Sequence, residues 1–158
     1  MPIIKIETEI NAPIEVVFDL SRSIDLHKIS TQQTKEEAIG GVTSGLIGKG
    51  ESVTWRARHF GIYQTLTARI TEFEKPTYFV DEMEKGIFQY FKHEHIFKEN
   101  GQQTRMIDVF DYGSPLGILG KVADKLFLEN YMRRFLEKRN KTIKAFAESE
   151  DWKTILKN

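Results

Sequence analysis

The side chains best suited to chemistry in this sequence are histidines and aspartates that alternate with apolar residues. In an extended strand, every second side chain points to the same face of the sheet. Counting by twos along four predicted strands places five ionisable groups on the apolar faces: His59, Asp81, His93, His95 and Asp108. An isolated charge on an apolar wall is costly unless it is paired. These groups are therefore expected to bond to one another, to hold the polar part of a ligand, or to do both.

Proton transfer is one reaction that such groups support. A histidine beside an aspartate acts as a general acid–base pair when a substrate lies close. We identify His95 and Asp108 as candidate catalytic residues, with His93 and Asp81 as alternative partners. The sequence contains no cysteine and no Gly-x-Ser-x-Gly nucleophile motif, so no covalent catalysis is expected. A binding protein is thus preferred over an enzyme, and an enzyme would be a cyclase or dehydratase without a covalent intermediate.

A metal site is a third interpretation of the same residues. His93 and His95 lie two positions apart, so both imidazoles share one face of a strand. Zinc sites need three or four convergent ligands, and two histidines alone are a weak signal. We predict no metal. The glycine-rich stretch from Gly45 to Gly50 lacks the Gly-Lys-Ser/Thr ending of a phosphate-binding loop, and no other cofactor is predicted.

The candidate residues lie on a series of predicted strands joined by short turns. Apolar alternation predicts strands over residues 51–59, 62–74, 77–84, 87–98 and 103–112. The breaks between them contain turn signals at hairpin spacing, namely Gly61, Pro76, Gly86 and Gly101. Strands with such short connections pair antiparallel, because parallel pairing requires long crossovers.

Other elements flank this meander. A strand over residues 3–10, short helices over 14–20 and 23–29, and an edge strand over 34–39 precede it. Ser114-Pro115 predicts the start of a long helix that runs to about Glu148. We predict one α+β domain over residues 1–150 and a short, loosely held tail over 151–158. The sheet and the long helix must bury their apolar faces on each other, and a twisted sheet curves around the helix and leaves internal space.

The overall composition disfavours several classes of partner. Lysine and arginine together number 23, as do aspartate and glutamate, and this balance is untypical of general nucleic-acid binders. The first residues lack the apolar core of a secretory signal. No segment approaches the roughly 18 apolar residues of a membrane span. We expect a cytoplasmic protein with no nucleic-acid partner and no membrane insertion.

The order of elements and several local segments resemble the START-like, or SRPBCC, superfamily over residues 3–148. The segments are Ile10-Asn11-Ala12-Pro13, residues 45–51 and Ser114-Pro115-Leu116-Gly117, while residues 55–61 and 93–95 are similar to a bacterial branch. The resemblance implies the helix-grip fold, a curved antiparallel sheet of six to seven strands wrapped around a long C-terminal helix. It implies relatives that are polyketide cyclases, dehydrases or lipid-transfer proteins. Quinone binding is disfavoured, because residues 23–29 lack the aromatic and proline of quinone-binding members.

We expect the internal cavity to bind a small hydrophobic molecule, such as a lipid, a polyketide or a polycyclic compound. Apolar walls with a few placed polar groups are the usual anatomy of small-molecule pockets. The residues expected to face this ligand are Trp55, His59, Asp81, Met83, Phe91, His93, His95, Met106 and Asp108.

A protein-interaction module is the remaining alternative. The long helix carries basic residues that are predicted to form a solvated outer face, or less favourably to contact an acidic partner: Arg133, Arg134, Lys138, Arg139, Lys141 and Lys144. The predicted long helix also carries four apolar or aromatic residues beyond those that one buried face requires. They are expected in the core, with the cavity mouth or a dimer contact as alternatives: Leu116, Ile118, Phe127 and Tyr131. The protein is accordingly expected to be a monomer or a dimer.

Overall fold

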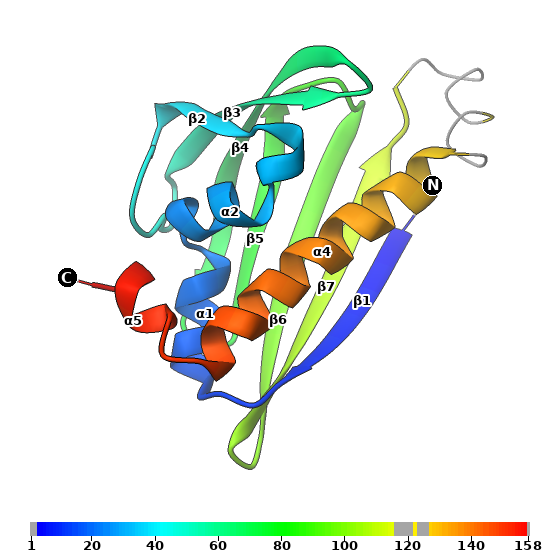
Figure 1. Ribbon diagram of the computed structural model, residues 1–158. Coiled ribbons are helices and arrows are strands. Elements are labelled where there is room, and N and C mark those ends of the chain that lie inside the picture. Colours follow the sequence, from blue (N-terminus) through cyan, green and yellow to red (C-terminus); the bar gives the residue numbers. More distant parts are fainter. Residues whose placement is uncertain (1–2, 116–121, 123–126, 158) are drawn as a thin grey trace.

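The computed structural model describes residues 3–115, 122 and 127–157, and in this part of the chain one antiparallel sheet curves around a long helix (Figure 1). The strands are β1 (Ile3–Ile10), β2 (Glu37–Gly41), β3 (Ser52–His59), β4 (Ile62–Glu74), β5 (Tyr78–Lys85), β6 (Tyr90–Asn100) and β7 (Gln103–Gly113). Their spatial order is β1-β7-β6-β5-β4-β3-β2. The strands from β2 to β7 therefore form a meander, and β1 closes the far edge by pairing with β7.

The helices of the described residues lie on the concave side of the sheet. They are α1 (Ile14–Ser21), α2 (Ile24–Ser30), the 3-10 turn η1 (Gln32–Thr34), α4 (Glu129–Glu148) and α5 (Trp152–Ile155). Figure 1 shows α4 running diagonally across the sheet, with α1 and α2 beside its C-terminal half. Ser23 caps α2, since its hydroxyl accepts a hydrogen bond from the Leu26 amide. None of the described helices has both the length and the apolarity that a membrane crossing demands.

Tight turns set the register of the sheet. His59 pairs with Ile62 across a two-residue turn in which Phe60 and Gly61 have φ values of 53° and 77°. Positive φ at both central positions is the type I′ geometry that matches the twist of a hairpin. With that register, Val53, Trp55 and Ala57 are buried while Arg56 and Arg58 are exposed. The turn therefore helps to direct the apolar face of β3 toward α4.

Two groups of buried side chains hold the helices to the sheet. The larger surrounds Phe18 of α1, whose ring packs edge-on against Phe79 and Phe97 at centroid distances of 5.4 and 5.2 Å. The smaller includes Phe91, Phe110 and Leu136, and lies toward the N-terminal half of α4. The site described below lies on the same concave face as these two groups.

The predicted α+β helix-grip architecture is confirmed, and the differences are local. The strand predicted to begin at residue 87 begins at Tyr90, because residues 86–89 form a bend whose Gln89 amide bonds to the Gly113 carbonyl. The edge strand predicted at 34–39 lies at Glu37–Gly41. Ser114 and Pro115 are not helical, and most of the segment predicted as the first turns of the long helix lies outside the described residues.

The predicted loose tail is packed onto the domain. Residues Trp152 to Ile155 form α5, and Trp152, Ile155 and Leu156 lie half-buried against the larger core group. Their apolar side chains offer a reason for this packing, since exposed apolar area is unfavourable.

Candidate functional site

An internal cavity of about 220 Å³ lies between the concave face of the sheet and α4. Its wall draws on β3 to β7, on the region of α1 and α2, and on α4. Aromatic side chains contribute much of the lining: Trp55, Phe79, Phe88, Phe91, Phe110 and Phe135. Apolar walls of this kind favour ligands with little exposed polarity.

One end of the cavity carries a stack of three rings. His95 of β6 lies between Phe79 and His93, with ring centroids 4.1 Å from the first and 3.8 Å from the second. His93 and His95 share a face of β6 because they lie two residues apart on one strand. Both line the cavity and both are buried.

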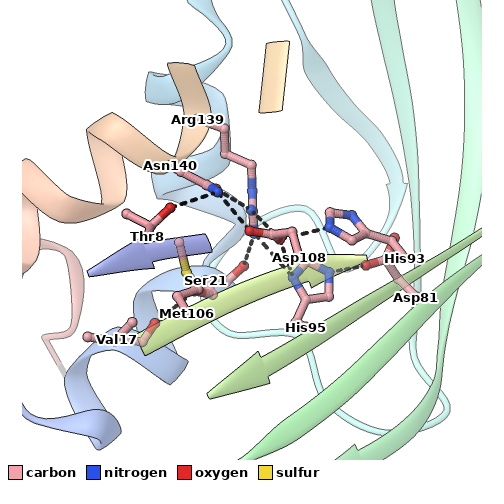
Figure 2. Close-up of polar contacts among 10 residues, drawn as sticks. All are labelled: Thr8, Val17, Ser21, Asp81, His93, His95, Met106, Asp108, Arg139 and Asn140. Carbon is pink, nitrogen blue, oxygen red and sulfur yellow. Dashed lines mark hydrogen bonds and ion pairs between the residues drawn. The ribbon is translucent and has the colours of Figure 1, made fainter. Parts of the chain in front are cut away.

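Behind the histidines, Asp108 forms the centre of a hydrogen-bond network (Figure 2). Its carboxylate is 0% exposed and accepts from His93 Nε2 at 2.8 Å and from Asn140 Nδ2 at 2.7 Å. Arg139 Nη1 lies 3.3 Å from the same carboxylate. The network thus joins β6 and β7 to helix α4.

Arg139 supplies the balancing positive charge. Its guanidinium donates to the Asn140 side chain at 2.9 Å and to the Ser21 carbonyl at 3.4 Å. A further contact of 3.5 Å reaches His95 Nδ1. The prediction of a solvated outer face is wrong for Arg139, which is 5% exposed, because it follows the buried stripe of Leu136, Asn140 and Ile143 along α4.

Asp81 of β5 completes the polar end of the cavity. Its Oδ2 lies 2.6 Å from His95 Nε2, and its side chain remains 21% exposed. Asp81 is one of the residues that line the cavity. It therefore presents a carboxylate to the interior, whereas Asp108 is enclosed by its partners.

Burial and hydrogen bonding set the protonation of this network. Burial disfavours the imidazolium form and, together with the neighbouring His93, lowers the pKa of His95 to about 4. A neutral His95 donates from Nε2 to Asp81 and accepts at Nδ1 from Arg139. Burial alone would raise the pKa of each carboxyl, but hydrogen bonds from the histidines and the charge of Arg139 lower the pKa of Asp81 and of Asp108. Both aspartates are thus ionised at neutral pH.

Asp81, His93 and His95 also form a set that could hold a metal ion, since their candidate ligand atoms lie within 4.8 Å of one another. A metal ion would have to replace the hydrogen bond between His95 and Asp81. It would also approach the guanidinium of Arg139, which contacts the His95 ring. The arrangement is better suited to hydrogen bonding than to coordination of a cation.

Two further polar pairs border the cavity. His27 Nε2 lies 3.0 Å from Glu36 Oε1, and His59 Nδ1 lies 2.5 Å from the Tyr131 hydroxyl. Burial would raise the pKa of Glu36, but His27, together with His59 and the Thr34 hydroxyl, lowers this pKa overall. Burial lowers the pKa of His59. The pair of His59 and Tyr131 connects the end of β3 to α4.

Six of the nine residues predicted to face a ligand line the cavity: Trp55, His59, Asp81, Phe91, His93 and His95. The other three are not among its lining residues. Asp108 lies behind the histidines, and Met106 is fully buried where its sulfur meets the Ser21 hydroxyl. Met83 packs against the smaller core group near Gly86. Strand alternation identifies which side chains point inward, but it does not show whether an inward side chain reaches the cavity or is covered by its neighbours.

Sequence reasoning missed His27, Glu36 and Arg139 as cavity residues. A signal for Arg139 and Asn140 was present, because both fit the helical spacing of the buried residues Leu136 and Ile143. Tyr131, expected mainly in the core, reaches the cavity wall, whereas Phe127 is 67% exposed. Leu116 and Ile118 lie outside the described residues.

The comparisons with known proteins agree with the fold. Residues 1–148 match the family model described as polyketide cyclase / dehydrase and lipid transport. No curated protein is significantly similar in sequence.

Several solved structures share the fold. The protein TTHA0849 from Thermus thermophilus is similar with a TM-score of 0.75 and 19% identity, over 91% of this chain and 95% of that one. The ZhuI aromatase/cyclase from Streptomyces sp. R1128 is similar with a TM-score of 0.69 and 16% identity, over 93% of each chain. The major latex-like protein 151 from Panax ginseng has a TM-score of 0.69 and 15% identity, over 94% and 98%. At these identities the likeness establishes the fold alone.

Proposed function

Because this chain belongs to the polyketide cyclase / dehydrase and lipid transport family, we propose that it binds a small, largely apolar molecule in the cavity between the sheet and α4. The observation that carries the proposal is the cavity itself, with largely aromatic and aliphatic walls that hold a few polar groups. Pockets for small molecules share this design, in which apolar area supplies affinity and a few polar groups set orientation.

The volume limits the size of the ligand. Pockets for drug-sized molecules have volumes of roughly 300–1,000 Å³, and the cavity here has about 220 Å³. A ligand of one or two rings, or a short acyl chain, fits this space better than a long-chain lipid.

A substitution that fills the cavity tests the proposal. Ala57 lies in the cavity wall on β3, and Ala57→Trp should abolish binding while the domain stays folded. The matched control is Arg58→Trp, which adds the same ring to the exposed face of the same strand. Binding is measured by titration calorimetry with a series of one- and two-ring compounds, and folding by circular dichroism. Equal affinity in Ala57→Trp and Arg58→Trp would refute binding in this cavity.

Native mass spectrometry of the purified protein addresses the ligand directly. A discrete organic mass that is present in the wild type and lost in Ala57→Trp would support the proposal and indicate the class of ligand. A mass that is retained in Ala57→Trp would place the bound molecule elsewhere.

A cyclase or dehydratase is the second candidate, favoured by the histidine and aspartate side chains in the cavity wall. Of the predicted catalytic pair, His95 lines the cavity while Asp108 is enclosed, so Asp108 would act by positioning His93. The test measures dehydration of a short poly-β-ketone by absorbance. Turnover that disappears in His95→Ala while binding persists would support an enzyme, and equal turnover in His95→Ala and the wild type would reject that residue.

A further inference from the structure

Most polar atoms around His93 and His95 have hydrogen-bond partners in the described part of the chain, but one carboxylate oxygen of Asp81 does not. His95 donates a hydrogen bond from Nε2 to Asp81 and accepts one at Nδ1 from Arg139. Asp108 accepts from His93, Asn140 and Arg139. Asp81 uses Oδ2 for His95, and no described residue donates to its Oδ1.

The open oxygen of Asp81 has accessible surface. Among the described residues, no fully enclosed side-chain nitrogen or oxygen lacks a hydrogen-bond partner. An unbonded Oδ1 on a half-buried side chain must therefore retain some surface, and Asp81 lines the cavity. The same reasoning applies to His93 Nδ1, since the bond of His93 to Asp108 uses Nε2. One side-chain oxygen or nitrogen from each of Asp81, His93 and His95 lies within 4.8 Å of the other two, so the three groups are neighbours on the cavity wall.

We propose that the ligand carries a hydrogen-bond donor, a hydroxyl or an amino group, on a small apolar ring system, and that this group donates to Asp81 Oδ1 beside His93. This inference rests on the proposed function and specifies the ligand class of the same cavity. A carboxylate oxygen only accepts, so an ether or ketone placed there would face it lone pair to lone pair. A purely apolar ligand would cover Oδ1 without supplying a hydrogen-bond donor to it, and an unpaired oxygen of a buried carboxylate is costly.

Four two-ring probes test this preference at neutral pH: 1-naphthol, 1-naphthylamine, 1-methoxynaphthalene and naphthalene. The first two donate a hydrogen bond, the third only accepts, and the fourth does neither. Each donor probe should bind the wild-type protein at least about ten-fold more tightly than 1-methoxynaphthalene, a difference of about 1.4 kcal/mol in calorimetry.

Asp81→Asn provides the second arm. The amide oxygen of an asparagine can still accept from His95 Nε2, and its NH₂ then occupies the place of Oδ1 as a donor. The order of affinities should therefore reverse, and Asp81→Asn should bind 1-methoxynaphthalene more tightly than 1-naphthol. Glu82→Gln is the matched control, since it removes a carboxylate from the next residue on β5, which points to the other face of the sheet and does not line the cavity.

The outcomes separate this inference from the proposed function. Equal affinity of the donor probes and 1-methoxynaphthalene for the wild type would overturn the inference while leaving the cavity as a binding site. An unchanged preference in Asp81→Asn would also overturn it. Failure of all four probes to bind would overturn the proposed function and the inference with it. The wild-type comparison decides the question even if Asp81→Asn does not fold.

Discussion

Replacing Arg139 by methionine should destabilise the protein strongly, because it leaves a buried carboxylate without its cation. Arg139 contacts the fully enclosed Asp108 at 3.3 Å and also donates to the Asn140 side chain and the Ser21 carbonyl. Methionine keeps most of the apolar length of the side chain but offers no donor. The network would then retain the negative charge of Asp108 with only His93 and Asn140 beside it.

Removing one partner from a buried ion pair costs about 3–5 kcal/mol of unfolding free energy. In a protein of this size, each kcal/mol corresponds to about 2–4 °C in the melting temperature. The melting temperature of Arg139→Met should thus fall by about 6–20 °C. Calorimetry gives the melting temperature, and urea unfolding followed by circular dichroism gives the free energy.

The control for this experiment is Arg134→Met, which makes the same change at an exposed position on α4. Its stability should stay within about 0.5 kcal/mol of the wild type. The double variant Arg139→Met/Asp108→Asn should recover part of the loss, because the charge left unpaired is then removed. Equal stability of Arg139→Met and Arg134→Met, or no recovery in the double variant, would refute the assignment of Arg139 as the cation that balances Asp108.

Two further predictions concern pH and backbone geometry. The pKa of His95 is lowered from an unfolded value of about 6.5 to about 4, so between these pH values the unfolded chain binds a proton that the folded protein does not. The unfolding free energy should therefore be highest above about pH 6.5 and should decline as the pH falls toward 4. Urea unfolding at a series of pH values measures this decline, and His95→Gln should make it shallower. An unchanged slope in His95→Gln would contradict the neutral state of His95. Gly41→Ala should cost clearly more stability than Gly50→Ala, because both glycines have positive φ but a Cβ at Gly41 would collide with the Ser52 carbonyl oxygen, whereas Gly50 faces open space. Melting temperatures that are equally lowered would show that the backbone at Gly41 has room to move.

The inward faces of the strands were predictable because alternation is a local property. Once a strand exists, Phe91, His93, His95 and Phe97 must share one face whatever lies opposite. The type I′ turn at Phe60 and Gly61 keeps the register of β3 and β4, so alternation could be followed across that hairpin without a slip. His93, His95 and Asp81 were thereby placed together before any partner was known.

The sequence by itself determined the element types, the antiparallel meander and the side of the sheet on which the histidines and aspartates lie, since each follows from spacings of a few residues. Only the tertiary structure decided that Asp108 lies behind the histidines, that Asp81 keeps an open oxygen, and that Arg139 turns inward. Arg139 meets Asp108 across 31 positions of the chain. That contact depends on the rotation and tilt of α4 over the curved sheet, and these are set by the packing of many side chains at once.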